Sequence, residues 1–431
     1  MSTYTIHGVD ARLTARYKQM VIEHTKASEK LSAGLKSIPD KVSSFASTQA
    51  AWRFYANENI TLQTLQEPLT AAAHDGIERS CKQYALGIND WSRLAFKHEN
   101  KKDTYAITHA TDIGYDLQSS LIINDQGGTP IGPAAHRLVS ANGSYATYYD
   151  DSKATLVKPH LDEVCDCIEH LEQKGFSKPL VHIIDREADS IFHMRELEQK
   201  GYHSVLRIKG GNRLQYEGKS QSGKVIAAQL SYQFNRRVEY HEKEYDQVVA
   251  EAIVQVTRAA KPGCKVTKQP SIPGEAIERR LVVSRVVSED GEVLAEWLLL
   301  TDVHDVDART IALWYYWRWR IESFFKLLKS AGHELEQWQQ ETDLAIFKRL
   351  MVVSMACVTV WQIAADDSPE AFELRAFLIK LSGRQVPRKQ AFTHPALLAG
   401  LWVFLSMLEV MESYSQDELT ALSLTLRRFY T

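Results

Sequence analysis

The sequence contains few cysteines, and they are irregularly spaced: Cys81, Cys165, Cys167, Cys264 and Cys357. An odd number without regular spacing indicates neither a disulfide framework nor a cysteine-based zinc site. This cysteine usage suits a reducing compartment, so the cytoplasm is the expected location.

Long apolar runs are also missing. The chain lacks an N-terminal signal pattern and a run of about 18 apolar residues, so no membrane partner is expected. The most apolar stretch, Leu350 to Ala364, is interrupted by Ser354 and Gln362 and is predicted to be a core helix. With 431 residues, 44% apolar and 24% charged, the chain is expected to form two or three globular domains.

The net charge of −3 does not by itself indicate a nucleic-acid partner. Positive charge is nevertheless concentrated locally. Residues 1–60 contain eight Lys or Arg and five Asp or Glu, and Val205 to Arg213 contains three cations and no acid. Such patches are compatible with a phosphate-bearing partner, although clusters of this size are also common on solvated surfaces.

The order of predicted elements gives the fold class. Residues 10–37 and 47–75 have helical patterns, which predicts a small helical N-terminal domain that binds DNA or only packs. Residues 84–209 follow the order β-β-β-α-β-α-β, which is typical of a mixed α/β sheet flanked by helices. Residues 210–303 alternate in a β-type pattern and are predicted to form a β-rich insertion, and helices follow to the end.

The stretch from Tyr315 to Lys329 is predicted to form one helix with a polar stripe beside its apolar face. The stripe consists of Tyr315, Arg318, Glu322, Lys326 and Lys329, and the apolar face of Trp314, Trp317, Ile321, Phe324, Phe325 and Leu328. An ordinary explanation is an Arg318–Glu322 ion pair at i, i+4. The alternative is that the stripe lines the rim of a cleft.

Two aspartates, Asp90 and Asp185, each follow an apolar strand pattern, LGIND and VHIID. Carboxyl ends of strands are where α/β sheets place ligand-binding groups, although such Asp residues also form turns. Together with Glu322 they would give three hard oxygen ligands suited to Mg²⁺ or Mn²⁺. Two such ions about 4 Å apart support phosphodiester chemistry. Arg318 and Lys329 would then hold phosphates.

The first aspartate has three competitors, which are Asp103, Asp112 and Asp116. Asp112 precedes the strand beginning at Gly114 too closely to end a strand of its own, and Asp116 lies within a strand pattern. Asp90 is therefore the preferred first acid.

Tyr315, Arg318, Glu322 and Lys329 fit the pattern Tyr-x2-Arg-x3-Glu-x6-Lys. This pattern resembles the signature of bacterial insertion-sequence transposases of the IS-four family, in the DDE, RNase H-like superfamily. Further stretches resemble the family's catalytic blocks, sheet and DNA-binding domain: LGINDWSRLAF, DREAD, GYDLQSSLII, WLLLT (297–301) and AAWRFYANENI (50–60). The resemblance covers nearly the whole chain and fades after about residue 370.

The resemblance implies a cut-and-paste DNA transposase acting as a homodimer on double-stranded DNA, through a DNA hairpin associated with the β-rich insertion. Asp90, Asp185 and Glu322 would be catalytic and bind two divalent ions, Mg²⁺ or Mn²⁺. Tyr315, Arg318 and Lys329 would contact phosphates near the transposon end.

Three further residues receive a role from the resemblance. Trp297 would lie beside a flipped base, the alternative being a core Trp in an apolar strand. Arg207 and Lys209 would reach backbone phosphates, the alternative being solvated charge.

The expected domains are a helical DNA-binding domain (1–75), an RNase H-like catalytic domain (76–366) interrupted by the β-rich insertion (210–303), and a helical C-terminal region for dimerisation (367–431). Trp91 departs from the family pattern, in which a small hydroxyl residue frequently follows the first Asp. The rival interpretations are a catalytically silent transposase-derived DNA-binding protein, another RNase H-like nuclease, and a structural role. The structural role requires the three acids to be far apart.

Overall fold

The computed structural model describes most of the chain. The described residues are 6–26, 41–96, 103–149, 152–185, 190–241, 243–260, 272–388 and 390–429.

Between residues 84 and 209 the helices and strands follow the order expected from the sequence, with two short strands in addition, Tyr105–Ala106 and Gly143–Ala146. The helices are α1 (Ala11–Lys26), α2 (Lys41–Ala56), α3 (Leu62–Ser80), α4 (His160–Glu172), α5 (Ile191–Lys200), α6 (Gly223–Gln229), α7 (Ala308–Tyr316), α8 (Trp319–Leu328), η2 (Leu335–Gln337), α9 (Asp343–Ala365), α10 (Pro369–Ser382), α11 (His394–Ser413) and α12 (Gln416–Arg427). The strands are β1 (Ala85–Ala95), β2 (Tyr105–Ala106), β3 (Ile113–Asn124), β4 (Pro130–Ser140), β5 (Gly143–Ala146), β6 (Leu180–Ile184), β7 (His203–Ile208), β8 (Arg213–Tyr216), β9 (Lys219–Ser222), β10 (Gln233–Tyr240), β11 (Lys243–Val256), β12 (Ile277–Val287) and β13 (Val293–Thr301).

The centre of the molecule is a sheet with the strand order β4-β3-β1-β6-β7. β1, β3 and β4 pair antiparallel, whereas β1, β6 and β7 pair parallel. The antiparallel strands are joined by short connections, and each parallel pairing requires a crossover helix, which α4 and α5 provide. The predicted fold class, a mixed sheet flanked by helices, is confirmed.

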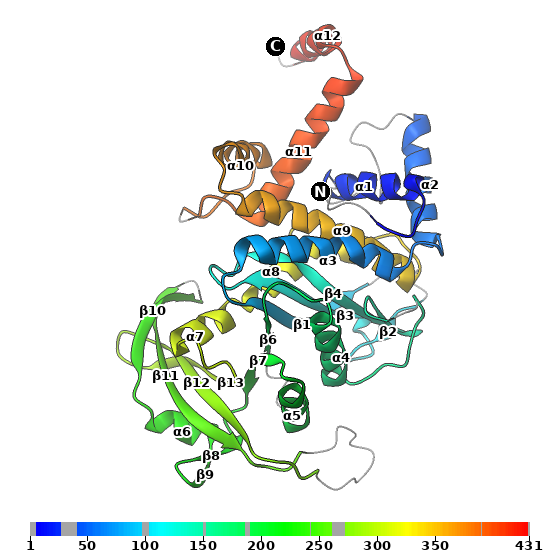
Figure 1. Ribbon diagram of the computed structural model, residues 1–431. Helices are drawn as coiled ribbons and strands as arrows, with labels where there is room; N and C mark the ends of the chain where they lie inside the picture. The colour runs from blue at the N-terminus through cyan, green and yellow to red at the C-terminus, as the bar shows by residue number, and fades with distance from the viewer. Residues whose placement is uncertain are drawn as a thin grey trace.

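The β-rich stretch after β7 continues the same sheet. β13 pairs antiparallel with β7, and β12, β11, β8 and β9 follow outward, with β10 paired to β11. In Figure 1 these strands curve away below the central sheet. The chain then returns through α7 and α8 to the face of the central strands, so the insertion ends next to the carboxylates discussed below.

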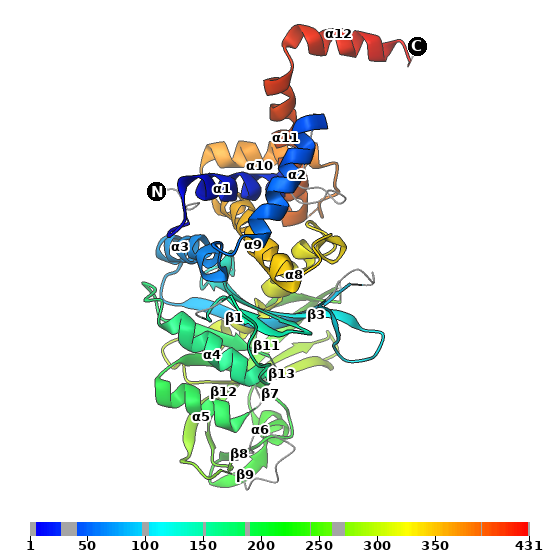
Figure 2. The same ribbon diagram turned by 90° about the vertical axis from the view of Figure 1, so that its right-hand side faces the viewer.

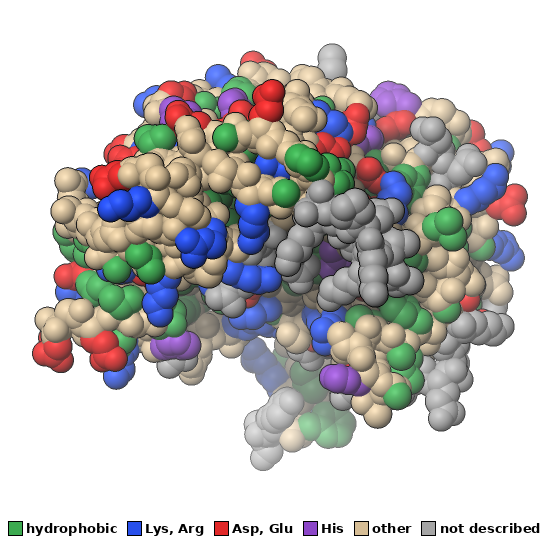
Figure 3. All heavy atoms as spheres, turned by 90° about the horizontal axis from the view of Figure 1, so that it is seen from below, with side chains coloured by type: hydrophobic (Ala, Val, Ile, Leu, Met, Phe, Trp, Pro, Cys, Tyr) green, Lys and Arg blue, Asp and Glu red, His purple; other side chains and the backbone are tan. Residues whose placement is uncertain are grey.

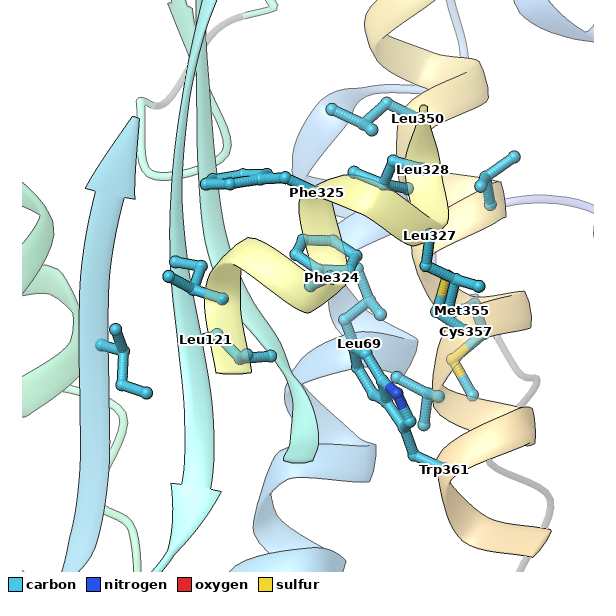
Figure 4. Packing of buried hydrophobic residues seen from close by; sticks show 14 of the residues in the cluster. Leu69, Leu121, Phe324, Phe325, Leu327, Leu328, Leu350, Met355, Cys357 and Trp361 are labelled. Atoms are coloured by element: carbon cyan, nitrogen blue, oxygen red, sulfur yellow. The ribbon is translucent and has the colours of Figure 1, made fainter. Parts of the chain in front are cut away.

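Helices cover both faces of the central sheet (Figures 1 and 2). α4 and α5 lie on one face, and α8 lies between the other face and the long helix α9 (Figure 4). Phe324 and Leu328 of α8 are buried against Met355 and Trp361 of α9, all in one apolar cluster. The predicted apolar face of the 315–329 segment is therefore buried, and it fixes the position of the polar stripe beside it.

The N-terminal helices are not packed as a separate body. α1 contacts α9 and α11, and α3 contacts β4 and α9. The boundary expected at residue 75 lies inside α3, while residue 366 follows the last residue of α9. DNA binding by residues 1–75 stays a prediction.

Two helices, α9 and α11, are long and apolar enough to cross a membrane by length and composition alone. The apolar window of α9 is 83% buried in the molecule, as expected for the core helix predicted at Leu350 to Ala364. The corresponding window of α11 is 28% buried.

One buried histidine ties α9 to the sheet and gives a testable pH dependence. His136 of β4 is 1% exposed, and its ring nitrogens lie 2.8 Å from Ser119 Oγ and 3.1 Å from Ser354 Oγ. Burial lowers the pKa of His136 to about 3 from 6.5. The unfolded chain therefore binds the additional proton between these values, and the stability contributed by neutral His136 is lost as the pH falls below 6.5.

We expect acidification from pH 7 to pH 5 to reduce the free energy of unfolding by about 2 kcal/mol through His136 alone. Urea unfolding of the intact chain and of His136→Gln at both pH values measures this, because the variant should lose that part of the pH dependence. His109→Gln, at an exposed position, is the matched control. Equal pH dependence in the intact chain and His136→Gln would contradict the assignment.

Candidate active site

Asp90 and Asp185 are neighbours because of strand register. The parallel pairing of β1 with β6 ends at Asn89 and Ile184, so the next residues on both strands lie side by side. Leu86 and Ile88 on β1, like Val181 and Ile183 on β6, belong to the apolar cluster that contains α7 and α8. By strand alternation, Asp90 and Asp185 face the same helices.

The expectation that Asp90 ends its strand is wrong. β1 continues to Ala95 because β3 pairs with it along its whole length, from Ala85 with Asn124 to Ala95 with Gly114. Asp185 does follow the last residue of β6. The other residues of DREAD, 186–189, lie outside the described residues.

The single helix predicted from Tyr315 to Lys329 is in fact two helices, since α7 ends at Tyr316 and α8 begins at Trp319. The break places Tyr315 in α7, Arg318 at the N-cap of α8 and Glu322 within α8. Tyr315 and Arg318 are buried, with 6% and 7% exposed. Glu322 lies in the first turn of α8, where the helix dipole favours a negative charge.

One guanidinium joins all three predicted catalytic acids. Arg318 Nη1 lies 2.6 Å from Asp90 Oδ2, and Arg318 Nη2 lies 3.1 Å from Glu322 Oε1 and 3.6 Å from Asp185 Oδ2. The ordinary i, i+4 pair between Arg318 and Glu322 is present. It is part of a cluster drawn from β1, the end of β6 and α8, so the three acids lie close together, whereas the structural alternative requires distant acids.

Asp185 has two further donors in the same cluster. Tyr315 Oη donates to Asp185 Oδ1 at 2.9 Å, and Arg207 Nη1 donates to the same oxygen at 3.0 Å. Desolvation by burial, followed by the Asp185 charge, raises the pKa of Tyr315, which stays a neutral donor at physiological pH. Three predicted DNA-binding residues, Tyr315, Arg318 and Arg207, therefore contact acids of the cluster.

Burial dominates the electrostatics of Asp90. It raises the pKa of Asp90 to about 6 from 3.8, with smaller increases from Asp185 and Glu322, although Arg318 and the Trp91 backbone N–H stabilise the charged form. Ionised carboxylates that lie this close together raise the free energy of the folded chain unless a cation compensates their charge.

The remaining predicted DNA-binding residues lie farther along the surface. Lys329 Nζ contacts Glu336 Oε1 at 3.0 Å and the Arg93 carbonyl oxygen at 2.6 Å. Lys209 is exposed just beyond the last residue of β7. Trp297 on β13 is half-buried, and its ring centroid lies 6.5 Å from that of Tyr240. In the described part of the chain, none of these three residues forms a hydrogen bond or ion pair with Asp90, Asp185 or Glu322.

The competing aspartates are placed elsewhere. Asp116 contacts His160 Nε2 at 2.8 Å, and Asp112 contacts Arg93 and Thr108. Asp103 accepts the backbone N–H of Asp343 at 3.2 Å. Only Asp90 among the four contacts Arg318 in the described part of the chain, which favours it as the first acid.

Two residues near the site were not predicted. Arg236 of β10 lies over the Tyr316 ring, 4.7 Å from its centroid, so a cation of the insertion reaches α7. Glu336 of η2 accepts the Ala95 N–H at 2.9 Å and holds Lys329. Neither has a local sequence signal, because each partner comes from a distant segment.

Trp91, the departure from the family pattern, serves the other face of the sheet. Its ring stacks on His160 at the start of α4, with centroids 4.8 Å apart and an interplanar angle of 14°. Asp90 accepts the Trp91 backbone N–H at 2.9 Å, a bond that does not depend on the side chain. A large residue after Asp90 therefore packs α4 without entering the carboxylate cluster.

We expect Trp91→Ser to lower the free energy of unfolding by about 2–3 kcal/mol, because the aromatic stack and its apolar contacts are lost. Trp91→Phe retains a ring and should cost less than about 1 kcal/mol. Urea unfolding measures both changes. Trp319→Ser, at a position 55% exposed, is the matched control. A loss in Trp91→Ser no larger than in this control would contradict the proposed packing.

A second group of metal-ligating residue types lies between α4 and α5. The ligand atoms of Cys165, His193 and Glu196 lie within 4.8 Å of one another. Both His193 ring nitrogens already have partners, Ser190 Oγ at 2.8 Å and Asp162 Oδ1 at 2.7 Å, and Lys200 contacts Glu196 at 3.0 Å. This cluster is on the helices opposite α8 and is separate from the three acids.

The residues around Arg318 fit a divalent cation. Carboxylate oxygens from three elements converge on one positive group in a partly desolvated position, and oxygen donors are those that Mg²⁺ and Mn²⁺ prefer. Side-chain exposures of 20%, 27% and 32% for Asp90, Asp185 and Glu322 leave the cluster accessible.

Comparison with known families agrees with this geometry. Residues 159–358 match the family model of the transposase DDE domain. The matched range includes Asp185 and Glu322, whereas Asp90 lies before it. The expectation of a DDE-superfamily transposase is confirmed, and divalent-metal use is general in this superfamily.

No curated protein matches the chain. Among solved structures, it is similar to a piggyBac transposase in a cryo-EM synaptic complex with hairpin DNA. That similarity has a TM-score of 0.38 at 9% identity and covers 99% of this chain and 77% of the other.

Proposed function

We propose that this chain is a metal-dependent cut-and-paste DNA transposase. The observation that carries the proposal is the convergence of Asp90, Asp185 and Glu322 on the Arg318 guanidinium, within a chain that matches the family model of the transposase DDE domain over residues 159–358. These three acids would hold two divalent ions, Mg²⁺ or Mn²⁺. When bound, the ions would activate the attacking oxygen and stabilise the leaving oxygen.

Cations beside the acids and farther along the surface would orient the DNA. Arg318 and Arg207 present planar guanidinium groups suited to phosphate oxygens, and Lys329 presents a point charge at the end of α8. Seen from below in Figure 3, Lys and Arg side chains gather toward the middle of that face, which suits a phosphodiester backbone. Tyr315 would keep Asp185 in place by its hydrogen bond.

The proposed reaction has four steps. Water attacks the phosphorus at the transposon end and breaks its bond to the 3′ oxygen, which leaves as a 3′-hydroxyl. That hydroxyl attacks a phosphorus of the opposite strand and forms a hairpin, and the bond to the flanking DNA breaks so that its 3′ oxygen leaves as a hydroxyl. A second water attacks the hairpin phosphorus and releases the 3′-hydroxyl of the transposon end again. This hydroxyl then attacks a phosphorus of target DNA, from which the 3′ oxygen of the target strand leaves as a hydroxyl. The insertion supports the hairpin step, because Trp297, Arg236 and Lys209 lie on its strands or beside its junction with β7.

A second copy of the chain is the proposed partner in synapsis, with α11 and α12 as the contact. α12 contains no buried residue and projects away from the body in Figure 2. Large apolar side chains are exposed on α12 and just after it, at Leu422, Leu424, Leu426 and Phe429. Analytical ultracentrifugation at micromolar concentration tests this proposal, and a monomer under those conditions would contradict it.

A cleavage assay tests the catalytic proposal. The intact chain is incubated with duplex DNA carrying the genomic ends that flank the gene, with Mg²⁺, Mn²⁺ or a chelator. We expect nicking and a hairpin product only with metal, the hairpin being recognised on a denaturing gel by its slow migration. Nicking without a hairpin product would support the proposed hydrolysis step and contradict the proposed hairpin intermediate. DNA binding without cleavage in either metal would favour the alternative, a catalytically silent DNA-binding protein.

A further inference from the structure

Arg318 cannot pair with the three acids while the same acids bind a divalent cation. In the described structure its two terminal nitrogens are used by three carboxylates from separate elements. The side chain is 9% exposed, so this arrangement is largely shielded from solvent. A divalent cation among the same oxygens would face a positive group at hydrogen-bond distance, which repels it strongly in a partly desolvated site.

DNA offers Arg318 another partner. A phosphate oxygen matches the guanidinium fork as well as a carboxylate does. If Arg318 turns from the acids to a phosphate, the acids lose their internal cation and become able to hold metal. Each ligand therefore favours the same rearrangement of one side chain.

We propose that Arg318 couples metal binding to DNA binding, so that the three acids take up divalent ions tightly only when a DNA end is present. This inference rests on the proposed function. It assigns Arg318 a specificity role, because metal-dependent hydrolysis is confined to the DNA-bound chain. Binding linkage is reciprocal, so metal strengthens DNA binding by the same factor.

Neighbouring contacts allow a matched comparison. Arg207 also carries a guanidinium and also contacts Asp185, at 3.0 Å, but among the described residues it forms no ion pair with Asp90 or Glu322. Removing Arg207 changes the site by one positive charge, as removing Arg318 does. Only Arg318 bridges all three ligands, so the coupling should depend on Arg318 and not on charge alone.

Mn²⁺ titrations of the full chain test the proposal, with binding measured by the loss of the free-ion electron paramagnetic resonance signal. Each protein is titrated alone and with a duplex ending in the flanking genomic sequence and carrying a free 3′-hydroxyl. For the unaltered chain we expect the duplex to lower the Mn²⁺ Kd at least tenfold, a coupling of about 1.4 kcal/mol. For Arg318→Gln we expect a lower Kd without DNA and a DNA effect below threefold.

Arg207→Gln should retain the tenfold effect of DNA. Arg318→Lys, which keeps the charge but lacks the fork, should give intermediate coupling and guards against misfolding of Arg318→Gln. An undiminished DNA effect in both Arg318 variants overturns the inference. Mn²⁺ binding that is unchanged in Asp185→Asn would instead reject the metal site and with it the proposed function, so the two failures are distinguishable.

Discussion

Replacing Glu322 with Gln is expected to reduce metal-dependent cleavage of the DNA end by roughly 10³-fold or more, as is typical when a member of a catalytic unit is removed. Gln retains an oxygen that can accept from Arg318 Nη2, which lies 3.1 Å from Glu322 Oε1, so the α8 contact persists. The amide lacks the negative charge that a divalent cation requires. The loss should therefore affect metal binding and rate, with little change in stability.

Gel-based initial rates with Mg²⁺ measure this effect, and thermal unfolding verifies that the variant folds. Glu336→Gln is the matched control, since Glu336 also lies near the site but contacts Lys329 and Ala95. Cleavage by Glu322→Gln within threefold of the unaltered chain would show that Glu322 is not a metal ligand.

The same assay identifies the first acid. Asp90→Asn and Asp185→Asn should match the loss in Glu322→Gln, because all three acids contact the same guanidinium. Asp112→Asn should retain activity, since Asp112 contacts Arg93 and Thr108 instead. A full loss in Asp112→Asn with activity retained in Asp90→Asn would reverse the choice made from the sequence.

The features of this site that depend on local sequence pattern could be predicted from the sequence. The helical period predicted that Tyr315, Arg318 and Glu322 share a side next to a buried face, and they are adjacent in the structure. Alternation and an apolar run predicted that Asp185 follows β6. These signals are local, because a side chain's direction within one element follows from its spacing.

Features that depend on distant partners were not predictable in the same way. The length of β1 is set by its pairing with β3, so Asp90 lies within a strand and not at its end. The turn between α7 and α8 has no Gly or Pro to mark it, and it arises where both helices pack into the core. The contact of Arg318 with acids of β1 and β6 joins segments far apart in the chain.

Exchanging Glu163 for Gln is expected to lower the free energy of unfolding by about 3–5 kcal/mol. Glu163 of α4 is 0% exposed and pairs with Arg137 of β4, which is 1% exposed, at 3.1 Å. Gln retains an acceptor for the Tyr149 hydroxyl, which lies 2.8 Å from Glu163 Oε2, but leaves the Arg137 charge uncompensated inside the protein. A buried charge without a partner is among the most destabilising changes available to a protein.

A double-mutant cycle separates the pair from its surroundings. Arg137→Met should also cost several kcal/mol, whereas Arg137→Met with Glu163→Gln removes both charges and should cost at least about 2 kcal/mol less than the sum of the two single changes. Urea unfolding gives the three values. Asp246→Asn, which breaks the exposed Arg237–Asp246 pair, is the control and should change stability by less than about 1 kcal/mol.

Additive losses would mean that Arg137 and Glu163 are held independently, for example by Ser144 and Tyr149. Non-additive losses in the free energy of unfolding would mean that this ion pair joins α4 to β4. That attachment matters for the site because α4 begins at His160, which stacks on Trp91, the residue after Asp90. Loosening α4 should therefore weaken the support behind the first acid without touching the carboxylate cluster itself.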